Sequence, residues 1–201
     1  SHIAAESINE GSVSVSSMVS VMDVIDPTDV AIYREAAGGT TTSHVMHGSA
    51  NPIGGQNAVI KHRWGEDAEG LLFQGAPPTI KFALGENPKR SRSAGTGQPQ
   101  RYPASRMGVM DVVRQAFVEA TEYRREWDAY EDRREGGDRG AIPPRRDLKL
   151  DPLVEILNGT LFVHAHSYRA DEILQLMRVA EEFGFRIHTF QHVLEGYRVA
   201  D

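Results

Sequence analysis

Two histidines close an apolar run at residues 161–166, which reads LFVHAH. His164 and His166 are two residues apart, so in a regular strand their side chains point the same way. A third histidine, His192, closes the next apolar run, and Lys81 lies inside an earlier one. Neutral imidazole is the commonest metal ligand in proteins, and catalytic Zn²⁺ keeps one position open for water. The pattern therefore indicates a metal centre at the ends of strands.

Each of these residues also has a structural interpretation. A lone histidine near a strand end is more often a hydrogen-bonded structural residue, and we apply this interpretation to four others: His44, His47, His62 and His188. Lys81 is either functional or reaches solvent along its neighbours, because a buried lysine without a partner is costly. Spacing alone does not show which of His188 and His192 belongs to the site, since residues four apart in a regular strand lie on the same face.

The composition is that of a globular protein with one sizeable core. Of 201 residues, 40% are hydrophobic and 25% charged, with a formal net charge of −6. The mild acidity argues against nucleic-acid binding, which needs a basic stripe. There is no cysteine, so disulfides and thiolate metal sites are excluded and the redox compartment stays undecided. No apolar run approaches the roughly 20 residues that span a bilayer, so we expect no membrane partner.

Short apolar runs alternate with helical segments along the chain. We expect strands at residues 40–46, 57–64, 77–84, 159–166 and 186–192. A first helix is expected at 26–39, capped by Asp26 or Thr28. A second, at 170–184, carries apolar residues at helical spacing and stops at Gly184. Strand, helix, strand of this kind predicts a right-handed crossover and a parallel sheet.

Residues 88–150 are interpreted as an elaborated connection between two strands. It begins with a basic loop without acids after Glu86, interpreted as solvated, with a grip on an anionic substrate group as the alternative. Its basic residues are Lys89, Arg90, Arg92, Arg101 and Arg106. An amphipathic helix follows from about Val109 to Arg134. The alternation fits an α/β fold, either an open doubly wound sheet or a (β/α)8 barrel. A whole barrel needs about 250 residues, so a partial barrel fits this length.

Five segments in the same order resemble the amidohydrolase superfamily, and more narrowly metal-dependent hydrolases related to imidazolonepropionase. They read SHIA at 1–4, GGTTTSHVMHGSANPIGGQ at 38–56, IKFALGENPKR at 80–90, HAHSYRADEI at 164–173 and FQHVLEGY at 190–197. The resemblance implies a partial (β/α)8 TIM-type barrel over residues 1–201, covering roughly strands two to six. The insertion at about 88–150 then separates strands four and five.

The resemblance also implies a site holding one or two divalent metal ions, with zinc expected. His2 matches the second histidine of a His-x-His pair, and Lys81 matches a strand-four lysine that is often carboxylated and bridges two metals. His166 is the better match to the strand-five ligand and His164 the second choice. His192 matches the strand-six ligand. The first-strand partner of His2 and a strand-eight aspartate have no counterpart, so we expect a fragment of a longer enzyme that does not turn over substrate alone.

The expected reaction is hydrolysis of a C–N bond, in an amide or cyclic amide, by a metal-activated water, with Lys81 and His192 taking part. Asn51, Gly55 and Gln56 are expected to contact the substrate, with a plain glycine turn as the alternative. The substrate is expected to be a small molecule or short peptide, and a homo-oligomer is possible. Two other functions stay open: a deaminase of the same fold, and a non-catalytic barrel scaffold whose long charged helix binds a protein partner.

Overall fold

A four-stranded sheet with the order β2-β4-β5-β6 forms the centre of this computed structural model, which describes residues 8–89 and 101–200. Three strands run parallel: β4 (Thr79–Ala83), β5 (Phe162–Ser167) and β6 (Ile187–His192). β2 (Ile53–Gln56) lies antiparallel to β4. The fold class is therefore α/β with a parallel-containing sheet, as the sequence predicts.

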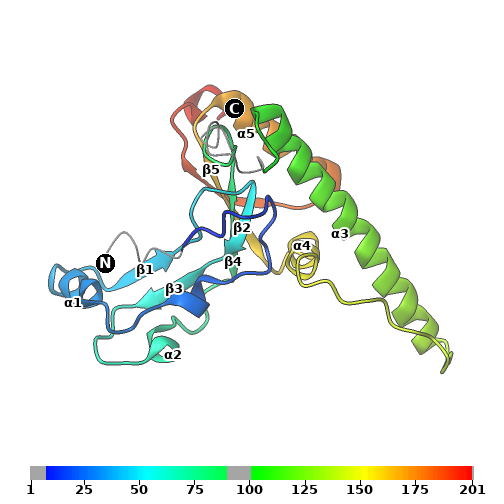
Figure 1. Cartoon of the computed structure of the whole chain (residues 1–201), viewed down its shortest axis with the longest axis horizontal. Coiled ribbons are helices and arrows are strands. Elements are labelled where there is room, and N and C mark those ends of the chain that lie inside the picture. The colour runs from blue at the N-terminus through cyan, green and yellow to red at the C-terminus, as the bar shows by residue number, and fades with distance from the viewer. Residues whose placement is uncertain (1–7, 90–100, 201) are drawn as a thin grey trace.

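Helices cover one face of this sheet. They are α3 (Arg106–Glu135), α4 (Asp151–Leu157) and α5 (Ala170–Phe183). Alternate strand residues, such as Ile80, Phe82 and Val163, form one buried core with these helices. Figure 1 shows α3 and α4 on one side of the sheet and the β1–β3 pair on the other. The polar strand residues, Lys81 and His164 among them, consequently face away from the helices.

A smaller layer precedes β4. β1 (Thr42–Val45) pairs antiparallel with β3 (Ala58–Lys61), and α1 (Val30–Ala37) and α2 (Ala68–Leu71) pack on this pair. Ile32, Ile60 and Leu71 form its core. Two short 3-10 helices complete the described elements, η2 (Val21–Val24) and η3 (Gly196–Arg198).

The five expected strands are all present, as β1, β3, β4, β5 and β6, each shorter than expected, with β1 and β3 only four residues long. The parallel connection from β5 through α5 to β6 is confirmed. β1 and β3 lie outside the four-stranded sheet and form their own antiparallel pair. The described strands form an open sheet, and closure into a barrel stays a proposal.

Three elements and one cap differ from the sequence expectations. The sequence predicts neither β2 nor the two helices α2 and α4. β2 contains Gly54 and Gly55, where a side chain would collide with the ring of His47 at 2.7 Å and with Val19 at 2.7 Å. The N-cap of α1 is Asp29, which accepts a hydrogen bond from the Ala31 amide, rather than Asp26 or Thr28. Strand formation at 53–56 thus depends on distant contacts.

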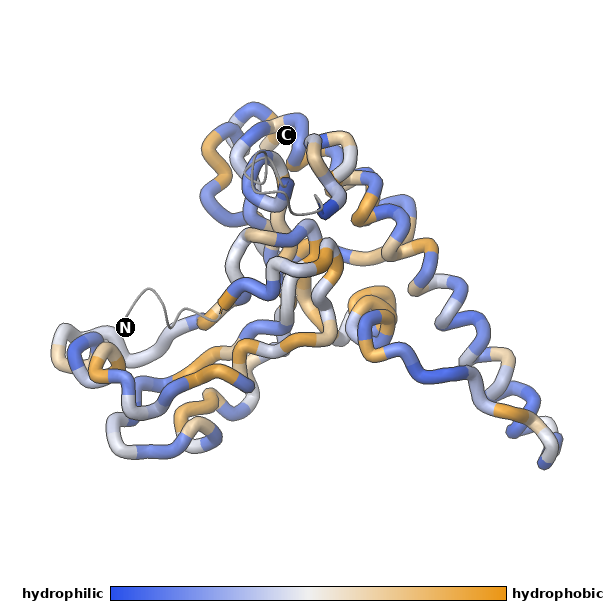
Figure 2. Tube along the Cα trace, viewed as in Figure 1, coloured by the Kyte–Doolittle hydropathy of each residue, from blue (hydrophilic) through white to orange (hydrophobic). Residues whose placement is uncertain are grey.

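The long helix α3 has two different halves. Its buried residues end at Tyr123, and the remaining turns extend beyond the body of the molecule (Figure 1). Hydrophilic residues predominate along this distal half, whereas apolar residues gather in the sheet and α4 (Figure 2). Among the described helices, none combines the length and the apolar character that a membrane span requires.

Replacing Gly184 by Ala should lower the free energy of unfolding by about 1 kcal/mol, because Gly184 ends α5 at φ 76°, where a Cβ is unfavourable. A Cβ there would meet no other atom within 4 Å, so the loss of stability would come from the backbone conformation and not from a steric clash. Gly38→Ala is the matched control, since Gly38 ends α1 with φ −78°. Urea unfolding measures both variants, and an equal effect in the two would contradict the explanation.

Candidate functional site

A cluster of nitrogen-bearing side chains occupies the sheet face opposite the helices. Lys81 comes from β4, His164 and His166 from β5, and Gln191 and His192 from β6. Strand register places Lys81 beside His164, and His166 beside Gln191. His164 and His166 lie on the same face of β5, as their spacing predicts, and Lys81 of β4 lies on that face too.

Lys81 is buried, with only 6% of its surface exposed. Its Nζ donates a hydrogen bond to Oε1 of Gln191 at 2.6 Å. Within the described residues it forms no ion pair, and burial lowers the pKa of its amino group from the usual value. The alternative in which Lys81 reaches solvent is wrong, and the side chain is closer to the neutral amine than a surface lysine is.

His166 is the most enclosed imidazole of the cluster, at 2% exposed. Neither of its ring nitrogens has a hydrogen-bond partner in the described part of the chain. Burial, with the charges of His192 and Lys81 as smaller causes, lowers the pKa of His166 to about 4. A neutral ring with a free lone pair is the form that coordinates a metal ion. The cost of leaving two buried nitrogens unpaired is what a ligand at this position would remove.

His164 lies two residues before His166 on the same strand, between two other imidazoles. Its ring centroid is 4.9 Å from that of His44 and 5.6 Å from that of His188. Its Nδ1 is buried without a partner among the described residues. Burial, followed by the effects of His44, His188 and Lys81, lowers the pKa of His164 to about 4. His164 thus shares the donor character of His166.

The position of His192 depends on unusual backbone geometry. His192 has φ 69° and the β-branched Val193 has φ 47°, which lie in a backbone region that residues other than glycine rarely adopt. Register places His192 beside Ser167, yet its ring lies 4.7 Å from that of His166. Such backbone strain clusters at functional sites. The strain at the end of β6 holds His192, which is exposed, against the buried His166.

Sequence reasoning missed several members of the cluster. His44, which we had interpreted as structural, bonds Thr79 Oγ1 through Nε2 at 2.8 Å and packs edge-on against His164. His188 also joins the cluster, because a register shift at the start of β6 breaks the strand alternation. Tyr168 packs 4.5 Å from His166, centroid to centroid. Strand alternation in β1 could have indicated His44, but the irregularity in β6 leaves no sequence signal.

The other predicted site residues lie elsewhere. His2 falls outside the described residues. Asn51 is buried and donates to the carbonyls of Glu10 and Val13 at 2.5 and 2.6 Å. Gln56 donates to Ser17 O at 3.1 Å, and Gly55 gives Val19 close approach. These contacts attach residues 10–20 to Asn51 and β2. The glycines lie in β2 rather than in a plain turn, and substrate contact by Asn51, Gly55 and Gln56 stays a prediction.

The basic loop is only partly described. Arg90 and Arg92 lie outside the described residues. Arg101 donates to four backbone carbonyls, among them Ala50 O at 2.7 Å. Arg106 pairs with Glu86 at 3.1 Å and with the buried Glu172 at 3.0 Å. These two arginines therefore take part in the packing of the chain rather than standing as solvated charges.

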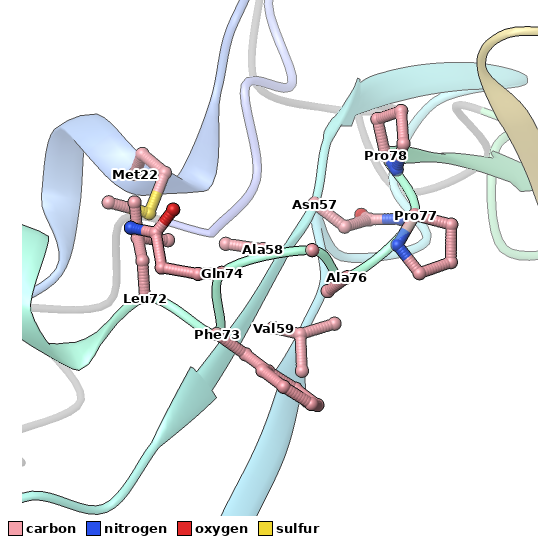
Figure 3. A pocket seen from close by; sticks show the side chains of 11 residues that line it. Met22, Asn57, Ala58, Val59, Leu72, Phe73, Gln74, Ala76, Pro77 and Pro78 are labelled. Atoms are coloured by element: carbon pink, nitrogen blue, oxygen red, sulfur yellow. The ribbon is translucent and has the colours of Figure 1, made fainter.

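A separate hollow of about 260 Å³ lies between β3, η2 and residues 72–78 (Figure 3). Apolar side chains and two amides, Asn57 and Gln74, line it, and none of its lining side chains titrates. Ligand pockets usually measure about 300 to 1,000 Å³. The chemistry is therefore concentrated in the lysine and histidine cluster.

The cluster fits a metal ion in part. The unpaired nitrogens of His166 and the nearby ring of His192 are suitable donors. In residues 8–89 and 101–200, however, no three His, Asp or Glu side chains are arranged to hold an ion. A complete coordination shell would need a further donor, which a modified Lys81 or a residue outside this set could supply.

Two known proteins are similar to the chain, although no protein-family model matches it. The amidohydrolase tasK of Hapsidospora irregularis is 31% identical over 211 residues, covering 96% of this chain and 20% of tasK. The crystal structure of an amidohydrolase from Thermotoga maritima has a TM-score of 0.83 and 33% identity. Both likenesses support the amidohydrolase family. The alignment with the Thermotoga protein covers 96% of this chain and 47% of that one, so the chain spans about half of one relative and a fifth of the other.

The two buried histidines should make stability depend on pH. Their folded pKa of about 4 lies below the ordinary 6.5, so stability is greatest above pH 6.5 and is lost as the pH falls toward 4. When the pH falls from 7.5 to 5, protonation linked to each histidine should lower the free energy of unfolding by about 2 kcal/mol. Urea unfolding with a chelator present measures this, and a His164→Leu, His166→Leu double variant should lose most of the dependence. An unchanged pH profile in that variant would contradict the assignment.

Proposed function

We propose that the chain forms part of a metal-dependent hydrolase of amidohydrolase type that cleaves the C–N bond of a small amide or cyclic amide. The likeness to two amidohydrolases supports the hydrolase class. The observation that carries the proposal is His166, buried with both ring nitrogens unpaired and with His192 against it. The proposal includes a partial (β/α)8 barrel in which β4, β5 and β6 are consecutive barrel strands, and a relation to imidazolonepropionase.

In this proposal His166 and His192 hold a divalent cation, with zinc favoured because imidazole suits it. His164 is the alternative strand-five ligand, and Lys81 becomes a further ligand when carboxylated, which allows a second ion. His2 is a further candidate ligand from the N-terminal segment. The cation, when bound, polarises the carbonyl group and lowers the pKa of water toward neutrality.

The side chains of the chain then have distinct roles. His166 is locked in the neutral form by burial, so it stays a donor at neutral pH. His192 lies at the exposed end of β6, where its imidazole can also donate a hydrogen bond to the carbonyl oxygen of a bound amide if only one ion is held. Tyr168 shields both rings on one side. The burial of Lys81, His164 and His166 keeps water out of the interior end of the cluster.

Replacing His192 by Ala should weaken Zn²⁺ binding by about tenfold to a hundredfold, because one imidazole donor is removed. Isothermal titration of the untagged chain with Zn²⁺ measures the affinity and the stoichiometry. His62→Ala is the matched control, since His62 bonds Ser43 and Thr40 away from the cluster and its loss should leave binding unchanged. No saturable Zn²⁺ binding, or equal weakening by both substitutions, would overturn the proposed site.

A further inference from the structure

The side-chain amide of Gln191 is the single hydrogen-bond partner of the Lys81 amino group among the described residues. The Nζ–Oε1 distance is 2.6 Å. No carboxylate forms an ion pair with Lys81 in this part of the chain, and His164 lies beside it in the sheet. The charge of Lys81 affects His44, His47, His164 and His166, which shows that all four lie close to it. The state of the Lys81 amino group is therefore controlled by burial and by one neutral amide.

The backbone of Gln191 is fixed in the sheet, whereas the nitrogen of its side-chain amide has only a weak partner. Gln191 lies beside His166 in the sheet, and its backbone carbonyl accepts a hydrogen bond from Ser167 Oγ at 3.4 Å. Its Nε2 contacts the sulfur of Met46 at 3.0 Å. A thioether is a weak acceptor, and the terminal torsion of a glutamine is broad and roughly two-fold. The amide can therefore turn over at low cost and offer N–H in place of C=O to Lys81.

We propose that Gln191 is a positioning residue for Lys81 that serves both the ammonium form and the carboxylated form by turning its amide. This inference rests on the proposed function, in which Lys81 reacts with carbon dioxide. The neutral amine forms a C–N bond to the carbon of CO₂, one C–O π pair moves to oxygen, and the nitrogen releases a proton to water. The product is an anionic carbamate, which needs a donor where the ammonium needs an acceptor.

A neutral amide suits these two forms better than its isosteres do. A carboxylate at position 191 would form an ion pair with the ammonium form and would repel the anionic carbamate. An apolar side chain would leave either form without a partner in a buried position. Gln191→Glu and Gln191→Leu should therefore both reduce carboxylation, although they change the charge of the cluster in different ways.

The test is a ¹³C NMR spectrum of the full chain with Zn²⁺ and ¹³C-labelled bicarbonate, in which a carbamate carbon gives its own signal. A Lys81→Arg variant identifies the signal by its loss. We expect Gln191→Glu and Gln191→Leu to reduce the signal by about tenfold or more, as for the loss of a hydrogen bond to a charged group. Gln175→Leu, the same change on α5, should leave the signal intact.

The same samples, analysed for bound zinc, separate this inference from the proposed function. A carbamate signal that is equal in the original chain and both Gln191 variants would overturn the role of Gln191. The absence of any Lys81-dependent signal in the original chain would overturn it as well. In either case, zinc bound through the histidines would leave the hydrolase proposal standing, whereas no bound zinc would remove that proposal too.

Discussion

His166→Leu should abolish tight Zn²⁺ binding and at the same time stabilise the metal-free chain. Loss of an imidazole ligand should weaken binding by about a hundredfold or more. In the metal-free protein, leucine removes two buried nitrogens that lack partners among the described residues, so the free energy of unfolding should rise by about 1 to 3 kcal/mol. Zinc titration and urea unfolding with a chelator measure the two effects.

A second buried histidine provides the control. His47 is 3% exposed, like His166, but both of its nitrogens are paired, with the Glu10 amide at 2.9 Å and with Gly48 O at 2.8 Å. His47→Leu should therefore destabilise the chain by about 2 kcal/mol, since it leaves backbone groups unpaired. Destabilisation of similar size in both variants, with zinc binding retained in His166→Leu, would show that His166 is an ordinary core residue.

Phe117→Ala should have the largest effect on stability, a loss of about 3 to 5 kcal/mol. Phe117 is fully buried in α3 and stacks on Phe185 with ring centroids 4.3 Å apart. It also contacts Phe82 of β4 and Phe183 of α5, so it joins the helices to the sheet. Chemical unfolding followed by circular dichroism measures the change.

The neighbouring Val118 is the control for this prediction. Val118 is 40% exposed, so Val118→Ala should change the unfolding free energy by no more than about 0.5 kcal/mol. An effect of Phe117→Ala as small as that of Val118→Ala would mean that α3 does not pack on the sheet. The packing of α3 would then not explain the position of β4, and of Lys81 on it, within the site.

Sequence periodicity predicted the helical layer because the pattern and the packing agree. The apolar positions of α3 from Val109 to Ala120 are buried in the core, as their spacing indicates. α5 ends at Gly184, which adopts the expected left-handed conformation. The 2-residue alternation in β5 likewise predicted that His164 and His166 share a face, whereas the place of Lys81 beside His164 follows from the register of β4 with β5.

The remaining features depend on contacts that no local pattern encodes. Gly54 and Gly55 have low strand propensity, and they lie at an irregularity of β2 where the ring of His47 and Val19 leave no room for a Cβ. In β6, the shared parity of His188 and His192 is broken by a register shift and by the left-handed backbone of His192 and Val193. Lys81, His164, His166 and His192 could therefore be predicted as members of the cluster, and alternation in β1 could have indicated His44, but His188 could not be predicted.

The central claim is that His166 binds a metal ion, and the most direct measurement is anomalous X-ray diffraction at the zinc edge from crystals of the chain grown with Zn²⁺. We predict a peak about 2.0 to 2.1 Å from a ring nitrogen of His166, the usual Zn–N distance, with His192 as a second ligand. Zinc bound only at histidines outside the cluster, such as His62, with no peak beside His166 or His164, would contradict the account.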